Sequence, residues 1–123
     1  MLLVEDNDLN REIAQSLLEM HGIQTDTAVN GAKAVEIYTE APQEYYSAVL
    51  MDIRMPVMDG LEATRRIRGL EKKTGGKIPI LAMTANAFAE DVQAALEAGM
   101  DDHIAKPVDM QVLCQSLQRL LKD

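Results

Sequence analysis

The sequence predicts an α/β fold built on a parallel sheet of five strands. Short apolar segments alternate five times with segments of helical spacing, and such alternation is typical of parallel strands joined by right-handed crossovers, with helices on both faces. The unbroken apolar run over residues 48–51 indicates a strand buried on both faces. At 123 residues, the chain is expected to form one domain, residues 1–123, with a single core.

The first half of the chain contains two strand–helix units. Residues 1–4 are expected to form a strand, followed by a helix that ends at His21-Gly22, because glycine commonly follows a helix end. The apolar face predicted for this helix consists of Leu9, Ile13, Leu17 and Met20. Residues 23–28 are polar enough for an edge strand. Asn30 is expected to cap the next helix and Pro42 to close it.

The third unit places a carboxylate at the end of a central strand. Asp52 directly follows the apolar run of residues 48–51. Pro56 and Asp59-Gly60 are turn signals, and a helix is expected from there to about Glu71. The carboxyl edge of an open parallel sheet is where ligands bind, so Asp52 is a candidate site residue.

Two further units complete the alternation. A basic loop over residues 72–77 precedes a buried strand, residues 78–83, that ends in Thr84. A helix capped by Gly99 follows, and its predicted apolar face consists of Phe88, Val92, Ala95 and Leu96. A brief strand at 104–105 leads to Lys106-Pro107. The last helix has a predicted apolar face of Met110, Leu113, Leu117, Leu120 and Leu121.

The composition argues against several classes of function. A net charge of -8 and a pI near 4.7 argue against a domain that grips nucleic acid or an anionic membrane, and they suit cations or basic partner surfaces. Cys114 is the only cysteine, so no internal disulfide can form and a reducing, cytoplasmic setting is expected. No segment resembles a signal peptide or a membrane span.

Chemically active side chains follow the predicted strands at their C-terminal ends. They are Glu5 and Asp6 after the first strand, Asp52 after the third, Thr84 after the fourth and Lys106 after the fifth. If the strand order is 2-1-3-4-5, as in flavodoxin-like doubly wound sheets, the first and third strands are neighbours and the carboxylates converge on one crevice. Each residue alone also suits a helix cap, a local hydrogen bond or a solvated charge. Their recurrence at successive strand ends favours a common site.

The residue types at this edge suit phosphoryl transfer. Convergent carboxylates require a held proton or a bound cation, and oxygen ligands in this number suit Mg²⁺, which leaves room for a phosphate oxygen. Lys106 adds a positive charge and Thr84 a hydroxyl, so developing negative charge can be neutralised. A carboxylate can itself be the nucleophile and form an acyl phosphate. Asp52, on the central strand, is the expected acceptor.

Three other functions fit a sheet of this kind less well. A flavin or nucleotide binder needs a glycine- or hydroxyl-rich cradle after the first strand, whereas residues 5–8 are acidic or amide side chains. A small-molecule aspartyl-phosphate hydrolase is disfavoured because Arg54, and not a second carboxylate, lies two residues after Asp52, and because the chain is too short for a substrate cap. An interaction module that is never phosphorylated is disfavoured by the intact set of acceptor residues.

Four motifs, in order, resemble the response-regulator receiver domain of two-component phosphorelay signalling. They are Val4-Glu5-Asp6-Asn7, Met51-Asp52-Ile53-Arg54-Met55-Pro56 with Asp59-Gly60, Thr84-Ala85 and Lys106-Pro107. The resemblance covers essentially the whole chain. Segments 56–64, 84–88 and 99–102 are similar to receivers at the C-terminus of hybrid sensor histidine kinases. A chain that ends after its fifth helix, with no DNA-binding output domain, agrees with that narrower resemblance.

The resemblance implies a chemistry for the carboxylates. Asp52 would accept a phosphoryl group from a phosphohistidine of a histidine kinase or a histidine phosphotransfer domain. Asp6, Asp52 and the backbone carbonyl of Arg54 would bind Mg²⁺, with Glu5 assisting through a water. The isolated domain would be no enzyme beyond promoting its own phosphorylation and dephosphorylation. A parent hybrid kinase would be a protein-histidine kinase.

The resemblance also implies a switch. Thr84, Lys106 and Ala85 would form the phosphoryl-binding and switch set, in which Lys106 contacts the phosphoryl oxygens and Thr84 swings in to bond one of them. The bond before Pro107 would be cis. Phosphorylation would alter an output surface made of the fourth helix, the fifth strand and the fifth helix. Direct contact with nucleic acid or membrane is not expected.

Two residues depart from the usual pattern or add to it. His103 stands three residues before Lys106, where the family usually has a tyrosine or phenylalanine; because imidazole ordinarily titrates near neutral pH, we expect partner binding to be pH-sensitive over about pH 6 to 8. Arg54 is expected to shield the acyl phosphate on Asp52, or to pair with it, and so lengthen its lifetime. Asn86 would lie on the opposite rim.

Overall fold

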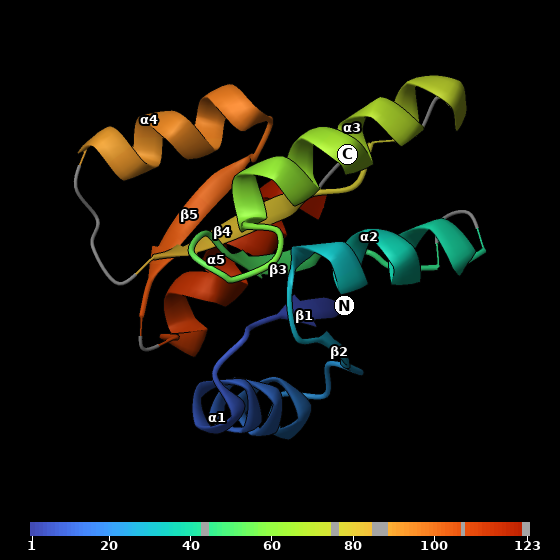
Figure 1. The fold of residues 1–123 in the computed structure, drawn as a ribbon. Helices are drawn as coiled ribbons and strands as arrows, with labels where there is room; N and C mark the ends of the chain where they lie inside the picture. Colours follow the sequence, from blue (N-terminus) through green and yellow to red (C-terminus); the bar gives the residue numbers. More distant parts are fainter. Residues whose placement is uncertain (43–44, 75–76, 85–88, 107, 122–123) are drawn as a thin grey trace.

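The computed structural model of the chain describes residues 1–42, 45–74, 77–84, 89–106 and 108–121, in which strands and helices alternate as predicted (Figure 1). The strands are β1 (Leu2–Val4), β2 (Asp26–Ala28), β3 (Val49–Asp52), β4 (Ile80–Thr84) and β5 (Asp102–Ala105). The helices are α1 (Asp8–Met20), α2 (Gly31–Glu40), α3 (Gly60–Thr74), α4 (Ala89–Ala98) and α5 (Met110–Leu121). The strand pairs are parallel in the order β2-β1-β3-β4-β5, which confirms the predicted topology.

The register of the sheet brings the strand ends to one edge. β1 and β3 are neighbours, so Glu5 follows β1 beside Asp52, the last residue of β3. The backbone N–H of Lys106 donates a hydrogen bond to the carbonyl oxygen of Thr84 (2.9 Å), which aligns the ends of β4 and β5. Residues from four different strands therefore meet at this edge.

Helices cover both faces of the sheet (Figure 1). On one face, α2, α3 and α4 contribute Ala34, Ile67 and Ala95 to a core with one side of the strands. On the other face, α1 and α5 contribute Leu18 and Leu113. All residues of β3 and β4 are buried, as the apolar runs predict for strands covered on both sides.

The predicted start of α2 and the predicted ends of α1 and α4 are confirmed. The side chain of Asn30 caps α2 by accepting a hydrogen bond from the backbone N–H of Lys33 (2.9 Å). Gly22 follows α1 with φ 79°, and Gly99 follows α4 with φ 110°, conformations that favour glycine. At Gly99 a Cβ atom would also come within 3.0 Å of Cγ of Arg68.

The apolar face predicted for α1 is wrong at three of its four residues; the fourth, Leu17, is partly buried and packs against the core. Leu9, Ile13 and Met20 are 64%, 48% and 79% exposed, and the buried residues of the helix are Ala14 and Leu18. Two apolar stripes fit the helical period here, and the stripe with the small alanine side chain packs against the sheet. The prediction counted large side chains and so selected the exposed stripe.

The same error affects α4, and several boundaries shift. Leu96 is 49% exposed, whereas its neighbour Ala95 is buried. β2 and β4 begin later than predicted, at Asp26 and Ile80, and α3 continues to Thr74. Of the residues predicted for apolar faces, Phe88 and the side chain of Leu121 lie outside the described part. In the described part of the chain, no helix has the length and the apolar composition needed to cross a lipid bilayer.

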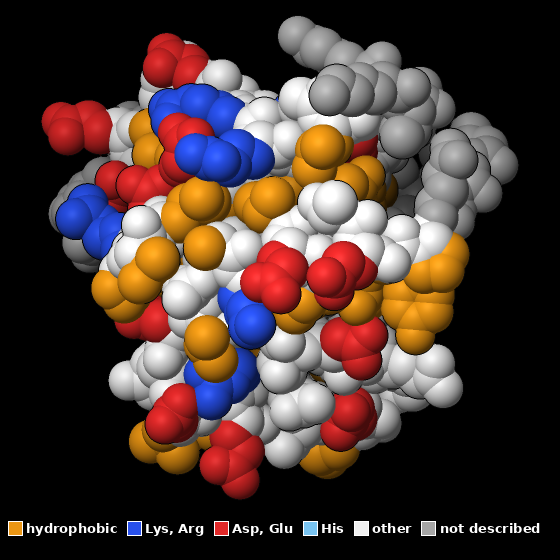
Figure 2. All heavy atoms as spheres, turned by 45° about the vertical axis from the view of Figure 1, so that its right-hand side comes forward, with side chains coloured by type: hydrophobic (Ala, Val, Ile, Leu, Met, Phe, Trp, Pro, Cys, Tyr) orange, Lys and Arg blue, Asp and Glu red, His pale blue; other side chains and the backbone are white. Residues whose placement is uncertain are grey.

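Acidic side chains are spread over the molecular face in Figure 2, among basic and apolar ones, in keeping with the net charge of -8. Ion pairs within single helices engage some of the basic residues, such as Lys33 with Glu36 (3.6 Å) and Arg66 with Glu62 (3.1 Å). Pairs of this exposed kind contribute little to folding stability. The less exposed ion pairs lie at opposite edges of the sheet: Lys106 with Glu5 and Asp52 at one edge, and Arg68 with Glu71 and Asp101 at the other.

Candidate functional site

Three carboxylates meet at the carboxyl edge of the sheet. Glu5, Asp6 and Asp52 each place one oxygen within a cluster in which these atoms lie within 4.8 Å of one another. Glu5 is 1% and Asp52 5% exposed, whereas Asp6 is open to solvent. The convergence predicted from the strand order is therefore present, and it concentrates like charges in a largely buried place.

Lys106 compensates this charge from the end of β5. Its Nζ atom donates a hydrogen bond to Oδ2 of Asp52 (2.7 Å) and lies 2.8 Å from Oε2 of Glu5. Burial alone would lower the pKa of Lys106, but the hydrogen bonds and charges of the two carboxylates outweigh burial and raise this pKa above its ordinary value. The lysine therefore stays charged between the two acids.

Glu5 has an electrostatic environment that disfavours its charged form. Burial raises the pKa of Glu5, the nearby Lys106 ammonium opposes this rise, and the charge of Asp52 adds to it. Oε2 of Glu5 is buried and contacts the ammonium as an ion pair, without an aligned hydrogen bond. One buried carboxylate oxygen therefore keeps lone-pair capacity for a cation.

The loop between β3 and α3 closes one side of the site. The backbone N–H of Arg54 donates to Oδ1 of Asp52 (3.3 Å), and the N–H of Gly60 donates to the carbonyl oxygen of Ile53 (2.9 Å). A Cβ atom at Gly60 would collide with the carbonyl oxygen of Asp52, so only glycine fits there. Val57, at the tip of the loop, has φ 70°, a conformation that is costly for a β-branched residue.

Thr84 lies where the sequence predicted it, as the last residue of β4, and it is buried. His103, on β5, has a 39% exposed side chain whose Nδ1 lies 3.8 Å from Oδ1 of Asp102. Ala85, Asn86 and the bond before Pro107 fall outside the described residues, so their predicted roles stay predictions.

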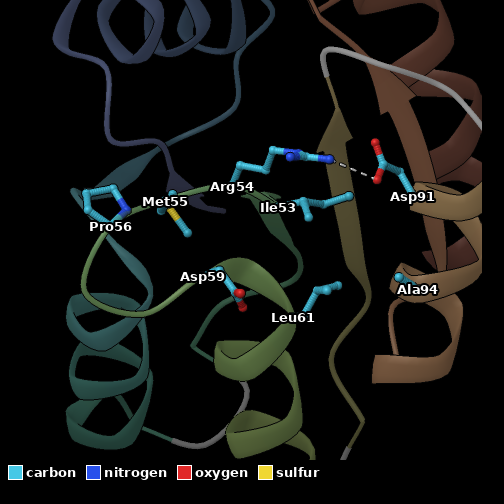
Figure 3. Close-up of a pocket in the computed structure, with 8 residues that line it drawn as sticks. All are labelled: Ile53, Arg54, Met55, Pro56, Asp59, Leu61, Asp91 and Ala94. Atoms are coloured by element: carbon cyan, nitrogen blue, oxygen red, sulfur yellow. Dashed lines mark hydrogen bonds and ion pairs between the residues drawn. The ribbon is translucent and has the colours of Figure 1, made fainter.

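A cavity of about 520 Å³ adjoins the loop between β3 and α3 (Figure 3). Its lining residues come from that loop, the start of α3, and α4: Ile53, Arg54, Met55, Pro56, Asp59, Leu61, Asp91 and Ala94. Across it, Nη2 of Arg54 lies 3.3 Å from Oδ1 of Asp91. Asp91 was missed from the sequence, because an acid in the first turn of a helix is explained by the helix dipole alone.

The donor set fits a hard divalent cation. It consists of oxygens from three carboxylates, two of which are buried. Lys106 already contacts two of these carboxylates, so the crevice accommodates a positive charge. Mg²⁺ is bound through one or two carboxylates, with water and phosphate oxygens completing its coordination. The ion would supply neutralisation of charge on a transferring phosphoryl group.

A sheet of this order with carboxylates and a lysine at its carboxyl edge defines an aspartate-based phosphoacceptor domain. The chain belongs to the response regulator receiver domain family, which it matches over residues 1–118. It is 40% identical to hybrid signal transduction histidine kinase I of Dictyostelium discoideum over 92% of its length, and 43% identical to two-component system protein A of Emericella nidulans over 95%. It spans only 7% and 17% of those proteins, so it corresponds to a receiver portion.

Solved receiver domains share the fold. One belongs to a sensor histidine kinase of Pseudomonas aeruginosa and has a magnesium ion in its active-site cleft; it is 39% identical, with a TM-score of 0.85 and coverage of 99% of this chain and 96% of that one. Another is the receiver of the response regulator Ssk1 of Saccharomyces cerevisiae, co-crystallised with the histidine phosphotransfer protein Ypd1. It is 34% identical, with a TM-score of 0.86 and coverage of 95% and 84%. The chain is thus a phosphoacceptor domain of two-component signal transduction.

Proposed function

We propose that Asp52 is the residue phosphorylated in this receiver domain, in a magnesium-dependent reaction with a phosphohistidine. An oxygen of Asp52 attacks phosphorus, the phosphorus–nitrogen bond to the donor imidazole breaks, and the leaving imidazole takes up a proton. The observation that carries the proposal is the contact of Lys106 Nζ with Asp52 Oδ2 (2.7 Å). Lys106 thereby holds a positive charge beside the carboxylate that would receive the phosphoryl group.

The other acidic residues are assigned to the cation. Asp6, Asp52 and the backbone carbonyl of Arg54 would bind Mg²⁺, and Glu5 would assist through a water. The carboxylate cluster supports this assignment, and so does the magnesium ion in the related Pseudomonas receiver. On phosphorylation Lys106 would contact the new phosphoryl oxygens, and the Thr84 hydroxyl would bond one of them.

The proposed readout is a change in the surface formed by α4, β5 and α5. A charged group added at Asp52 biases the loops that follow β3 and β4, and these loops lead into the helices next to that surface. His103 lies on β5 within this surface and is partly exposed, so a partner can reach it; the pH-sensitive contact stays a prediction.

The proposed partner is a histidine kinase or a histidine phosphotransfer domain. The exposed Leu9 and Ile13 provide apolar area on α1, the helix that follows Glu5 and Asp6, and Val57, 85% exposed, provides it on the loop after β3. A protein that presents a histidine to Asp52 would cover these side chains, and their burial would favour docking. The related Ssk1 receiver was co-crystallised with such a protein.

The parent protein is proposed to be a hybrid histidine kinase, because the curated relatives include such kinases and the chain matches only a small part of each. In that case the protein-histidine kinase activity belongs to other parts of the parent. The isolated domain would promote only its own phosphorylation and dephosphorylation. A cytoplasmic location stays a prediction.

The experiment is intact mass after incubation with a small-molecule phosphodonor, with and without Mg²⁺, on wild type and Asp52→Asn. The expected result is a gain of one phosphoryl group that needs Mg²⁺ and is absent in the variant. No gain in wild type under any condition would favour an unphosphorylated interaction module. A gain that persists in Asp52→Asn would place the acceptor elsewhere.

A further inference from the structure

Arg54 joins the acceptor to helix α4. Its backbone N–H donates to Oδ1 of Asp52 (3.3 Å), so the residue begins beside the acceptor carboxylate. Its side chain extends the other way, over the cavity, to Asp91 in the first turn of α4 (Figure 3). The guanidinium of Arg54 thus links the loop after β3 to helix α4. Among the described residues, no backbone hydrogen bond joins this loop to α4.

The ion pair between Arg54 and Asp91 is weak enough to be broken by a stronger anion. The side chain of Arg54 is 78% exposed and that of Asp91 19%, and the contact is a single one of 3.3 Å. Exposed pairs of this kind shift an equilibrium by only about two- to fivefold. A phosphoryl group on Asp52 would bring up to two negative charges and three acceptor oxygens, which match the guanidinium better than one carboxylate oxygen does.

We propose that Asp91 is a positioning residue for Arg54. It holds the guanidinium away from Asp52 before phosphorylation, and after phosphorylation it competes with the phosphoryl group for that guanidinium. This inference rests on the proposed phosphorylation of Asp52. It assigns a role in the lifetime of the acyl phosphate to a residue of α4 that contacts neither the carboxylate cluster nor Lys106 in the described structure.

Competition predicts opposite effects for the two members of one ion pair. Without Arg54, the acyl phosphate loses its shield and its lifetime shortens. Without Asp91, Arg54 has a single anionic partner left, and the lifetime lengthens. If the pair only stabilised the fold, or if Arg54 bridged both anions at once, loss of either residue would act in the same direction.

The experiment follows the decay of phosphorylated protein by intact mass, after removal of the phosphodonor, in wild type, Arg54→Ala, Asp91→Ala and the double variant. We expect Arg54→Ala to shorten and Asp91→Ala to lengthen the lifetime, each about two- to fivefold. The double variant should decay like Arg54→Ala, because Asp91 acts only through Arg54. Asp91→Glu should return the lifetime toward the wild-type value.

Glu90→Ala is the matched control, since it removes a negative charge from the same helical turn; its lifetime should stay near that of wild type. A shorter lifetime in Asp91→Ala, an equal lengthening in Glu90→Ala, or a double variant unlike Arg54→Ala would overturn the inference alone. Absence of any phosphoryl gain in wild type would instead overturn the proposed function, and the positioning role with it.

Discussion

Nη2 of Arg68 lies 2.8 Å from Oδ2 of Asp101 and joins α3 to the turn before β5, at the edge of the sheet opposite the carboxylate site. The same guanidinium donates to Oε1 of Glu71 (2.7 Å) and to the carbonyl oxygens of Ile78 (2.7 Å) and Gly99 (2.9 Å). The side chains of Arg68 and Asp101 are each 15% exposed, and that of Glu71 is 5% exposed. One planar cation therefore ties the end of α4 to α3 and to the start of β4.

Arg68→Ala is expected to lower the free energy of unfolding by roughly 3 kcal/mol, because it removes the buried cation from two largely buried carboxylates and leaves Asp101 only the exposed Lys77 (3.4 Å). Arg66→Ala is the control, since Arg66 pairs with Glu62 on the exposed side of the same helix and should cost under about 1 kcal/mol. Urea denaturation measures both. Equal losses in the two variants would show that the cluster adds nothing beyond an ordinary surface pair.

Lys106→Met tests the electrostatics of the carboxylate site. The lysine and a divalent cation compete for the oxygens of Glu5 and Asp52, so we expect the variant to bind Mg²⁺ more tightly. When a chelator removes Mg²⁺, the free energy of unfolding of the variant should be roughly 1–3 kcal/mol lower than that of wild type. The loss is no larger because the lysine is partly exposed, and solvent screens its charge. Added Mg²⁺ should therefore stabilise the variant more than wild type.

The measurement is the urea midpoint with and without Mg²⁺, with Lys33→Met as the control because the Lys33 side chain is exposed on α2. Equal stabilisation of Lys106→Met and wild type by Mg²⁺ would contradict competition for shared oxygens.

Sequence reasoning located the carboxylate crevice because the relevant signals are local. Asp52 ends an apolar run, and residues such as Glu5 and Lys106 follow other strands, so the strand order alone brings them together. Side-chain identity then indicates the chemistry. The contacts of Lys106 with both Glu5 and Asp52 could not be predicted from the sequence, and only the structure shows them.

The parts that sequence missed depend on how helices sit on the sheet. The Arg54–Asp91 pair forms only because the first turn of α4 lies across a cavity from the loop after β3. The apolar face of α1 was misassigned because Ala14 gives no strong hydrophobic signal, although its small size suits close packing. Periodicity reports that a helix is amphipathic, and packing decides which of two stripes is buried.

Val57→Gly is expected to stabilise the domain. Val57 is 85% exposed, so its side chain contributes little packing, and its φ of 70° is costly for a β-branched residue. Glycine removes that strain but has more freedom in the unfolded chain, and the net gain should be about 1 kcal/mol. Val29→Gly, at an exposed valine without positive φ, should destabilise the domain. A lower urea midpoint in Val57→Gly, at unchanged m-value, would show that the loop carries no such strain.

Ionised Asp102 should stabilise the folded domain, and this contribution should be lost when the carboxylate is protonated at acidic pH. Burial would raise the pKa of Asp102, but the backbone N–H of His103, the Ser116 hydroxyl and the Arg119 guanidinium outweigh burial and lower this pKa. Between the lowered folded pKa and the ordinary unfolded value near 3.8, the unfolded chain binds more protons, so stability rises with pH. The contribution is complete above the unfolded pKa and disappears as pH falls through the folded one.

Asp102→Asn should therefore weaken the domain near neutral pH and reduce the further loss of stability on acidification. Urea denaturation at a series of acidic pH values measures this slope for wild type, Asp102→Asn and Glu40→Gln, a control at the exposed end of α2. The asparagine variant should show the shallower dependence, because its amide has no proton to gain between the two states. Parallel curves for wild type and Asp102→Asn would mean that Asp102 has the same proton affinity in the folded and unfolded chain.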